Sequence, residues 1–265
     1  MNYLNKILIE KKGEVEKLKA GGVMHAFKLA ENSLPTTRNF SEALRRQNKS
    51  EPLRLIAELK KASPSRGLMV EDFRPLEIAE RYRLLGASSF SVLTDEKFFQ
   101  GHADYLKAVR QKYDLPVLRK DFMIDELQVY EARLMGADAI LLIVAALDLA
   151  ELKGFRELAE SLGMHVLVEV HDGTELELAA KSGANIIGVN NRDLKSFSVD
   201  LGTSINLRPQ FPEGAIAVSE SGIKTEDDLR LLEDADFDAV LIGEGLIQTD
   251  RLSRYPWTPR KAKTV

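Results

Sequence analysis

The chain has 265 residues, of which 44% are hydrophobic and 29% are charged, a composition typical of globular domains and unlike that of disordered chains. The 37 Lys and Arg against 41 Asp and Glu give a net charge of -4, so no overall positive field favours nucleic acid or an anionic membrane surface as a partner. The sequence has no cysteine, which excludes disulfides, thiolate nucleophiles and cysteine-ligated metal centres.

Metal sites and targeting segments also lack a sequence signal. No two of the four histidines have a metal-ligand spacing, so we expect no metal and no organic cofactor, and we interpret His102, His165 and His171 as surface or strand-end residues. The charged, amphipathic N-terminus lacks the features of a secretory signal, and no apolar run reaches 18 residues. These features predict a cytoplasmic protein that does not enter a membrane.

The first 48 residues show helical patterns and precede the first strand-like run. Two or three helical pieces are expected here, one of them at EALRR with Ser41 as its cap. We interpret residues 1–48 as an N-terminal helical extension of the domain that follows.

Eight short apolar runs then alternate with amphipathic stretches, which is the signature of repeated βα units. The runs are Leu53 to Leu59, Ser89 to Thr94, Pro116 to Lys120, Ala139 to Val144, His165 to Val170, Asn185 to Asn190, Ala215 to Glu220 and Ala239 to Gly243. Eight strands without a break in composition favour an α/β fold with a single (βα)8 TIM barrel over a doubly wound sheet.

Glycines mark the turns from helix to strand. Gly86, Gly136, Gly163 and Gly183 each stand just before a predicted strand, where a left-handed helix cap suits glycine. We place the catalytic barrel at residues 49–250 and expect residues 251–265 to form a loosely held C-terminal tail.

Polar side chains gather where the predicted strands end. Because active sites of such barrels form at the carboxyl ends of the strands, these residues are the candidates for chemistry. Glu58 and Lys60 are two positions apart and so face the same side of their strand. The other candidates are Lys120, Glu169, Asn190, Arg192 and Glu220.

Two interpretations of these charges remain open. They can form structural ion pairs that fill the barrel, or they can form a functional site. Burying several charges costs solvation free energy that pairing barely returns, which favours the functional interpretation for the whole set.

Small residues in the loops indicate a phosphate site. Barrels often bind phosphate in the loops after strands seven and eight, where Ser221, Gly222 and Gly243 lie. Ser63, in the loop after the first strand, is the fourth candidate.

Seven ordered motifs together resemble the indole-3-glycerol phosphate synthase family. They are IAELKKASPSRG, SVLTDEKFFQG, VLRKDFMIDELQVYEARLMGADAILLIVAAL, LVEVHD, IIGVNNRDL, AVSESGI and LIGEGL, and the resemblance spans Leu53 to Leu246. The resemblance implies a carboxy-lyase of tryptophan biosynthesis. Its substrate is 1-(2-carboxyphenylamino)-1-deoxyribulose 5-phosphate, which is cyclised, decarboxylated and dehydrated.

The same resemblance implies roles for the polar residues. Lys120 is the general acid of ring closure and Glu169 the base of the later proton removal. Lys60 grips the substrate carboxylate, Glu58 lies beside it, and either Lys60 or Lys120 assists dehydration. Asn190 and Arg192 position the substrate, and Glu220 binds sugar hydroxyls.

The remaining implied contacts hold the two ends of the substrate. Phosphate is surrounded by Ser63, Ser221, Gly222 and Gly243, and the benzene ring lies in an apolar slot of Phe98, Phe122, Leu141 and Leu194. The expected partner is this phosphorylated small molecule alone, with the chain as a monomer, although a partner protein stays possible.

Three other functions compete with this one. Phosphoribosylanthranilate isomerase relies on a cysteine, which the chain lacks. A Schiff-base aldolase needs a lysine with a lowered pKa, for which Lys120 is the candidate. A non-catalytic scaffold would be expected to have lost a catalytic group, and none is missing.

Overall fold

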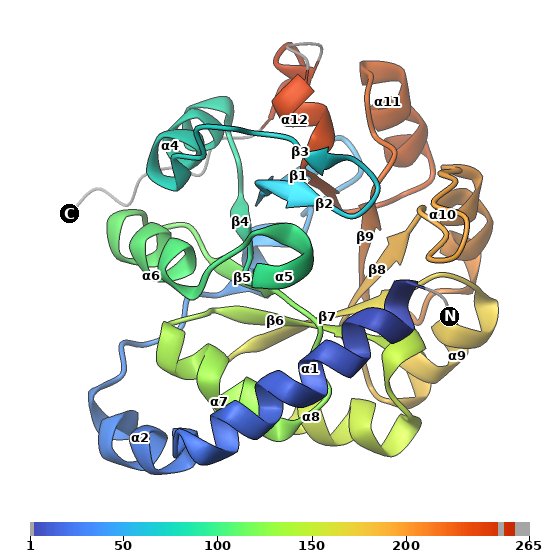
Figure 1. Ribbon diagram of the computed structural model, residues 1–265. Coiled ribbons are helices and arrows are strands. Elements are labelled where there is room, and N and C mark those ends of the chain that lie inside the picture. Colours follow the sequence, from blue (N-terminus) through green and yellow to red (C-terminus); the bar gives the residue numbers. More distant parts are fainter. Residues whose placement is uncertain (1–2, 249–251, 258–265) are drawn as a thin grey trace.

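A closed barrel of parallel strands forms the centre of the computed structural model, which describes residues 3–248 and 252–257. Neighbouring strands pair in the order β1, β10, β9, β8, β7, β6, β5, β4 and back to β1 (Figure 1). Their bounds are β1 Arg54–Leu59, β4 Ser89–Leu93, β5 Val117–Lys120, β6 Ala139–Ile143, β7 His165–Val170, β8 Ile186–Asn190, β9 Ile216–Glu220 and β10 Ala239–Ile242. A two-stranded hairpin, β2 Ala62–Ser63 with β3 Gly67–Leu68, lies in the loop after β1. The predicted (βα)8 barrel is confirmed, with strand ends within one residue of those expected.

Helices surround the barrel and precede it. Those between the barrel strands are α4 Pro75–Leu85, α5 Glu96–Phe99, α6 Ala103–Lys112, α7 Glu126–Met135, α8 Leu149–Ser161, α9 Gly173–Lys181, α10 Gly202–Leu207 and α11 Glu226–Asp234, with α12 Glu244–Gln248 after β10. The N-terminal helices are α1 Tyr3–Ala20, α2 Val23–Ala30 and α3 Phe40–Leu44, and short 3-10 turns are η1 Glu31–Ser33, η2 Val144–Ala146 and η3 Arg208–Gln210. Helix α1 runs diagonally across the front of the barrel (Figure 1).

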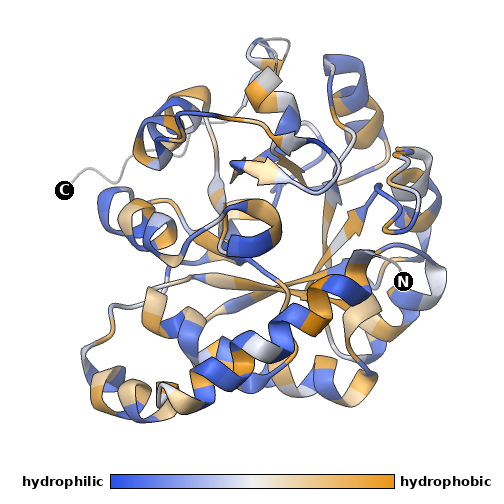
Figure 2. Ribbon diagram, viewed as in Figure 1, coloured by the Kyte–Doolittle hydropathy of each residue, from blue (hydrophilic) through white to orange (hydrophobic). Residues whose placement is uncertain are grey.

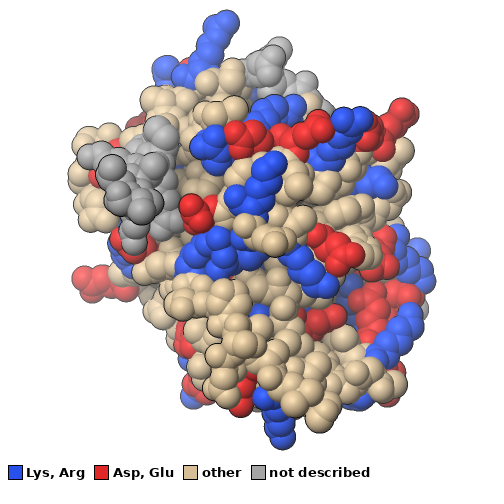
Figure 3. Space-filling model, turned by 90° about the vertical axis from the view of Figure 1, so that its left-hand side faces the viewer, with Lys and Arg blue, Asp and Glu red and all other residues tan. Residues whose placement is uncertain are grey.

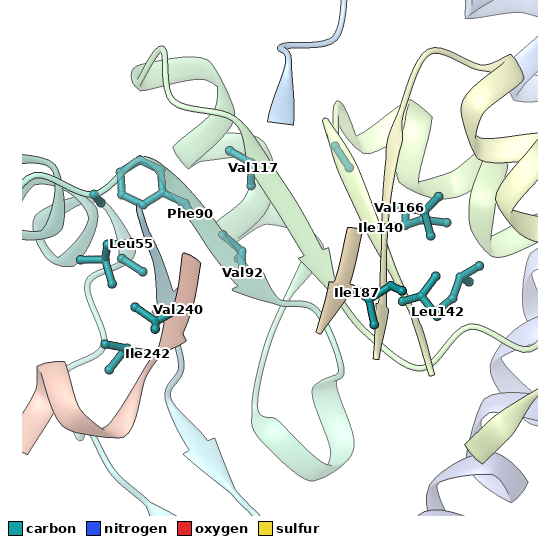
Figure 4. Packing of buried hydrophobic residues seen from close by; sticks show 14 of the residues in the cluster. Leu55, Phe90, Val92, Val117, Ile140, Leu142, Val166, Ile187, Val240 and Ile242 are labelled. Atoms are coloured by element: carbon teal, nitrogen blue, oxygen red, sulfur yellow. The ribbon is translucent and has the colours of Figure 1, made fainter. Parts of the chain in front are cut away.

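Every barrel strand except β4 divides its hydrophobic residues between two clusters. On β1, Leu55, Ala57 and Leu59 belong to the cluster between strands and helices, whereas Ile56 belongs to the cluster inside the barrel. Figure 4 shows the outer cluster, with side chains such as Phe90 and Ile140 projecting from the strands. The alternation follows from the two-residue period of a strand, and it sends Glu58 and Lys60 to the inside as predicted.

Hydropathy follows the same division in the helices. Figure 2 shows helices that carry both hydrophobic and hydrophilic residues, and strands that are largely hydrophobic. None of the helices in the described ranges is long and apolar enough to cross a membrane. One side of the surface shows acidic and basic side chains interspersed (Figure 3).

Helix α3 closes the barrel at the amino ends of the strands. Phe40 and Leu44 are completely buried and pack with Ile186, Ile216 and Ala239, which begin or nearly begin their strands. The expected cap at Ser41 is wrong. Asn39 caps the helix, with its side-chain oxygen accepting from the Glu42 amide at 2.9 Å, because the helix begins two residues earlier than expected and so buries Phe40.

The predicted loose tail is wrong for the part of it that the structure describes. Leu252, Tyr255 and Trp257 are buried in the outer cluster, and the Tyr255 hydroxyl accepts from the Leu53 amide at 2.8 Å. Trp257 packs on Gly86, where an added Cβ would come within 2.9 Å of the Trp257 Cβ. Apolar burial holds this segment, and residues 251 and 258–265 lie outside the described residues. The domain boundaries at residues 48, 49 and 250 stay predictions.

The four glycines at helix-to-strand turns have the predicted conformation. Gly86, Gly136, Gly163 and Gly183 have φ angles of 105°, 85°, 82° and 81°, in the left-handed region that glycine adopts at little cost. Each lets a helix end and the chain return to the barrel within a few residues.

Candidate active site

A cavity of about 630 Å³ opens at the carboxyl ends of the strands. Its lining includes predicted site residues from the barrel and from the loops, namely Glu58, Lys60, Ser63, Lys120, Phe122, Leu141, Glu169, Asn190, Arg192, Leu194, Glu220, Ser221, Gly222 and Gly243. Side chains that are far apart in sequence therefore meet in a single cavity, at the place where barrels of this kind bind their ligands.

Lys120 is the centre of a buried charge cluster in this cavity. Its ammonium group lies 2.9 Å from Glu169 Oε2 and 2.7 Å from Glu220 Oε2. The other oxygen of Glu169 accepts from the Asn190 amide nitrogen at 3.1 Å, whereas the other oxygen of Glu220, Oε1, is buried without a hydrogen-bond partner in the described part of the chain. The cluster therefore keeps one acceptor unsatisfied.

The surroundings move the pKa values of these groups in opposite directions. Burial acts to raise the pKa of Glu169, but Lys120, His171 and Asn190 outweigh it and hold that pKa below its ordinary value. At Glu220 burial prevails over the attraction of Lys120, and repulsion by Glu169 adds to it, so the pKa is raised. Burial acts to lower the pKa of Lys120, but the facing carboxylates raise it above its ordinary value. Near neutral pH the cluster thus offers an ionised carboxylate beside a protonated amine.

Glu58 and Lys60 form a second charged pair in the cavity. The two side chains are hydrogen-bonded, Glu58 from the end of β1 and Lys60 from the residue that follows the strand. They lie close over Gly243, where an added Cβ would meet Glu58 Oε2 at 2.2 Å and Lys60 Nζ at 3.1 Å. Any side chain at position 243 would therefore displace this pair.

Another glycine makes room for Glu220. A Cβ at Gly188, in the middle of β8, would lie 2.1 Å from Glu220 Oε1. Asn191 fixes the end of the neighbouring strand, because its amide nitrogen donates to Ser219 Oγ, to the Glu220 carbonyl and to the Ser221 carbonyl at 2.9 to 3.1 Å. These contacts set the direction of Glu220 and of the loop after β9.

The predicted phosphate residues Ser63, Ser221, Gly222 and Gly243 all line the cavity. Ser221 and Gly222 both have positive φ angles, 65° and 84°, a backbone conformation that sequence reasoning did not anticipate at a serine. Positive charge comes from Arg192 and from Arg66, which was not predicted. Both arginines face the Glu244 carboxylate, Arg66 at 2.7 Å and Arg192 at 3.5 Å.

Three of the four predicted apolar residues line the cavity, and Phe98 does not. Phe122, Leu141 and Leu194 are in the lining, whereas the neighbouring Phe99 takes the place expected of Phe98. Phe98 instead packs edge-on against Tyr3, with ring centroids 5.9 Å apart. Two adjacent phenylalanines gave no sequence signal of which one faces inward.

The N-terminal helix α1 completes the cavity, which the sequence did not indicate. Tyr3, Leu4 and Ile7 are part of the lining. Lys11, whose side chain is 1% exposed, lies 2.8 Å from both Asp95 Oδ2 and Asp121 Oδ1. This buried ion cluster anchors α1 beside the residue that follows Lys120. The described residues contain no group of three or more His, Asp or Glu arranged to hold a metal ion.

A family model described as indole-3-glycerol phosphate synthase matches residues 4–255. The chain belongs to this family. Proteins named indole-3-glycerol phosphate synthase from Chloroherpeton thalassium and Chlorobaculum tepidum are 65% and 55% identical to it, over 98% and 97% of this chain and the full length of each relative. The family assignment made from the ordered motifs is confirmed, and with it the assignment to the decarboxylating lyases of tryptophan biosynthesis.

Solved structures of lower identity share the fold. The N-acetylmannosamine-6-phosphate 2-epimerase from Clostridium perfringens is 12% identical, with a TM-score of 0.60 over 79% of this chain and 91% of that chain. KGPDC from Streptococcus mutans is 14% identical, with a TM-score of 0.57 over 77% of this chain and 94% of that chain. At these identities the likeness concerns the barrel alone.

Proposed function

We propose that the chain converts 1-(2-carboxyphenylamino)-1-deoxyribulose 5-phosphate to indole-3-glycerol phosphate, carbon dioxide and water. The observation that carries this proposal is the contact between Lys120 and Glu169, 2.9 Å apart in a single cavity. Their pKa values keep the one protonated and the other ionised. An acid and a base of fixed protonation state are what a sequence of ring closure and dehydration requires.

Lys120 acts in ring closure. The ring carbon that bears the carboxylate attacks the ketose carbonyl carbon, and the carbonyl oxygen takes a proton from the Lys120 ammonium as the new carbon–carbon bond forms. The bond to the carboxylate then breaks, and carbon dioxide leaves while its electron pair returns to the ring. Glu220, at 2.7 Å from the same ammonium, orients Lys120 and binds sugar hydroxyls.

Glu169 acts after the ring has closed. It removes a proton from the cyclised intermediate while the bond to the former carbonyl oxygen breaks and water leaves, which creates the indole double bond. Its ionised state and its hydrogen bond from Asn190 support this role. Lys60 grips the substrate carboxylate and, after carbon dioxide has left, gives the departing hydroxyl the proton with which it leaves as water. Glu58 orients Lys60 through their hydrogen bond.

The substrate lies between a polar part of the cavity lining, which binds its phosphate, and an apolar part, which binds its benzene ring. Its phosphate binds at Ser63, Ser221, Gly222 and Gly243, with Arg192 as the nearby cation. Its benzene ring lies on Phe122, Leu141 and Leu194, and Phe99 replaces Phe98 in this proposal. No metal ion or organic cofactor takes part.

The Schiff-base alternative is less well supported by the surroundings of Lys120. Imine formation needs a neutral amine, and therefore a lysine with a lowered pKa. Burial acts in that direction, but the two facing glutamates raise the pKa of Lys120 instead. Borohydride treatment with a carbonyl substrate should accordingly leave no trapped adduct.

The direct test is turnover of the anilino-ribulose phosphate by the purified protein. We expect the fluorescence of the indole product to rise together with release of carbon dioxide in equal amount. A protein that binds the substrate and forms neither product would contradict the proposal. We further propose a cytoplasmic location and a monomer, which fractionation and light scattering would check.

A further inference from the structure

His171 stands between the proposed base and the outside of the barrel. It follows β7 directly, two residues after Glu169, and faces the first turn of α9. The exposed fractions of the side chains rise from 3% at Glu169 to 14% at His171 and 18% at Glu175. The three residues therefore form a row from the buried base toward solvent, and the reaction described above uses only the first of them.

Glu175 determines which ring nitrogen of His171 carries the proton. Its Oε2 accepts from the His171 backbone amide at 2.8 Å and lies 2.9 Å from the ring Nδ1. A carboxylate oxygen accepts hydrogen bonds, so the ring donates through Nδ1–H. In the neutral ring Nε2 is then an acceptor.

Nε2 faces the proposed base with no partner of its own. It is buried and has no hydrogen-bond partner in the described part of the chain, and it lies 3.5 Å from Glu169 Oε1. Two acceptors that face each other are joined only when one of them holds a proton. A protonated Glu169 would donate to Nε2, and a protonated His171 would donate to ionised Glu169.

We propose that His171 is a positioning residue for Glu169. Glu175 orients the ring of His171. When Glu169 has removed a proton from the reaction intermediate, it donates that proton in a hydrogen bond to Nε2 of neutral His171. The two charge states of the ring then act oppositely. Neutral His171 stabilises protonated Glu169 and makes it a stronger base, whereas imidazolium stabilises ionised Glu169 and weakens it. This proposal rests on the role of Glu169 proposed above.

Other charged groups share this environment. Burial acts to lower the pKa of His171, but Glu175, Glu169 and Glu220 raise it above its ordinary value of about 6.5. Lys120 pairs with Glu169 and Glu220, so its positive charge partly offsets the effect of these two glutamates on the pKa of His171. The change of His171 from imidazolium to neutral ring therefore falls above pH 6.5.

The kinetic test compares His171→Gln with the wild type in single turnovers, following the step that consumes the cyclised intermediate. Glutamine has no charge at any pH. We expect that step to be slowed about tenfold at pH 9, which corresponds to a decrease of about one unit in the pKa of Glu169. At pH 6 we expect it to be slowed by less than about twofold. KM should stay within about threefold. A ratio of rates that is the same at both pH values would overturn the proposal.

A matched pair of variants on α9 tests the orientation by Glu175. In Glu175→Gln the amide can donate to Nδ1, which moves the proton of the neutral ring to Nε2 and removes the acceptor. This variant should show the same loss at pH 9 as His171→Gln. Glu177→Gln is the control, since Glu177 is on the same helix, 65% exposed and paired with Lys181. Equal rates in the two α9 variants would contradict the proposal.

Nuclear magnetic resonance of the imidazole nitrogens gives a readout that needs no turnover. The chain has four histidines, and the signals lost in His171→Gln identify His171. We expect a neutral ring protonated at Nδ1, a midpoint above 6.5, and a lower midpoint in Glu169→Gln but not in Glu177→Gln. A ring protonated at Nε2, or a midpoint unaffected by Glu169→Gln, would overturn the proposal.

The two arms separate the possible failures. If the wild type makes no indole from the anilino-ribulose phosphate, the proposed function fails, and the resonance measurements still decide the coupling between His171 and Glu169. If indole forms but the ratio of rates is independent of pH, the role of His171 fails alone.

Discussion

The two ends of the barrel both bury charged groups, but they satisfy them differently. At the amino ends of the strands, Asp138 accepts from the backbone amides of Arg38 and Val117 at 2.7 and 2.9 Å, and Asp238 accepts from the Ala217 amide at 2.9 Å. At the carboxyl ends, Lys120 and its two glutamates are bonded mainly to one another.

This difference in bonding partners distinguishes charges that hold the backbone from charges that can exchange a side-chain partner for a ligand. A carboxylate that holds backbone amides cannot leave them without breaking the connection between strands or helices. Side chains that hold one another can give up a partner to a ligand and regain it after release. Glu220 Oε1, buried without a partner, belongs to the second kind, so the polar groups at this end suit chemistry more than stability.

Removal of Lys120 should have the largest effect on catalysis and little effect on the fold. Lys120→Ala should lower kcat by about 10²- to 10⁴-fold, because ring closure loses its proton donor. A product analogue should still bind within about tenfold of the wild type, since phosphate and carboxylate contacts remain. Stopped assays and calorimetry would measure both. Near-normal turnover, or an unfolded protein, would instead make Lys120 a structural ion-pair partner.

Glu169→Gln should slow a later step, by about 10²-fold. The variant loses the base but keeps a side chain that can hydrogen-bond Lys120. A rapid-quench experiment should find a cyclised intermediate that Lys120→Ala never forms. Absence of that intermediate from the Glu169 variant would remove the assignment of Glu169 to dehydration.

Asp138→Ala should show the opposite behaviour. Loss of its carboxylate takes the acceptor from the buried Val117 amide and the ion-pair partner from Arg110, 3.1 Å away, which should lower the free energy of unfolding by about 2 to 3 kcal/mol. Urea titration would measure this. The kcat and KM of the protein that remains folded should change less than twofold or so. If Asp138→Ala lost turnover while its free energy of unfolding stayed unchanged, the distinction between structural charges at the amino ends and functional charges at the carboxyl ends would be wrong.

Ser221→Asp should weaken substrate binding. It sets a carboxylate against the substrate phosphate, so KM should rise about tenfold while kcat falls less. Ser196→Asp, on an exposed part of the loop after β8, is a suitable control. An unchanged KM would locate the phosphate elsewhere in the cavity.

Chelation should have the smallest effect of all. Side chains already supply the cations and carboxylates of the proposed reaction, so turnover should be the same with and without EDTA. Activity that disappeared with EDTA and returned with one divalent ion would show that the carboxyl end of the barrel holds a metal.

The barrel and most of the site residues could be predicted from the sequence because strand periodicity determines both. Once the run from Leu53 to Leu59 is recognised as a strand, Glu58 and Lys60 must face the same side. The order of the strands then brings Lys120, Glu169 and Glu220 to the same end.

What the sequence did not reveal depends on packing between distant segments. The contribution of α1 rests on Lys11 reaching Asp95 and Asp121, a contact that no local pattern encodes. Phe99 rather than Phe98 enters the cavity because Asp95 caps the short helix α5 by accepting from both of their amides, which sets the direction of that turn. The burial of Trp257 depends likewise on a gap beside Gly86.

The hydrogen bond from the Leu53 amide to the Tyr255 hydroxyl also has a consequence for synthesis. The first barrel strand leaves the ribosome roughly 200 residues before the tyrosine that completes its edge. Its neighbour β10, Ala239–Ile242, emerges only shortly before that tyrosine. The nascent chain must therefore carry a sheet with an unpaired edge until β10 has emerged, and only then can the barrel close.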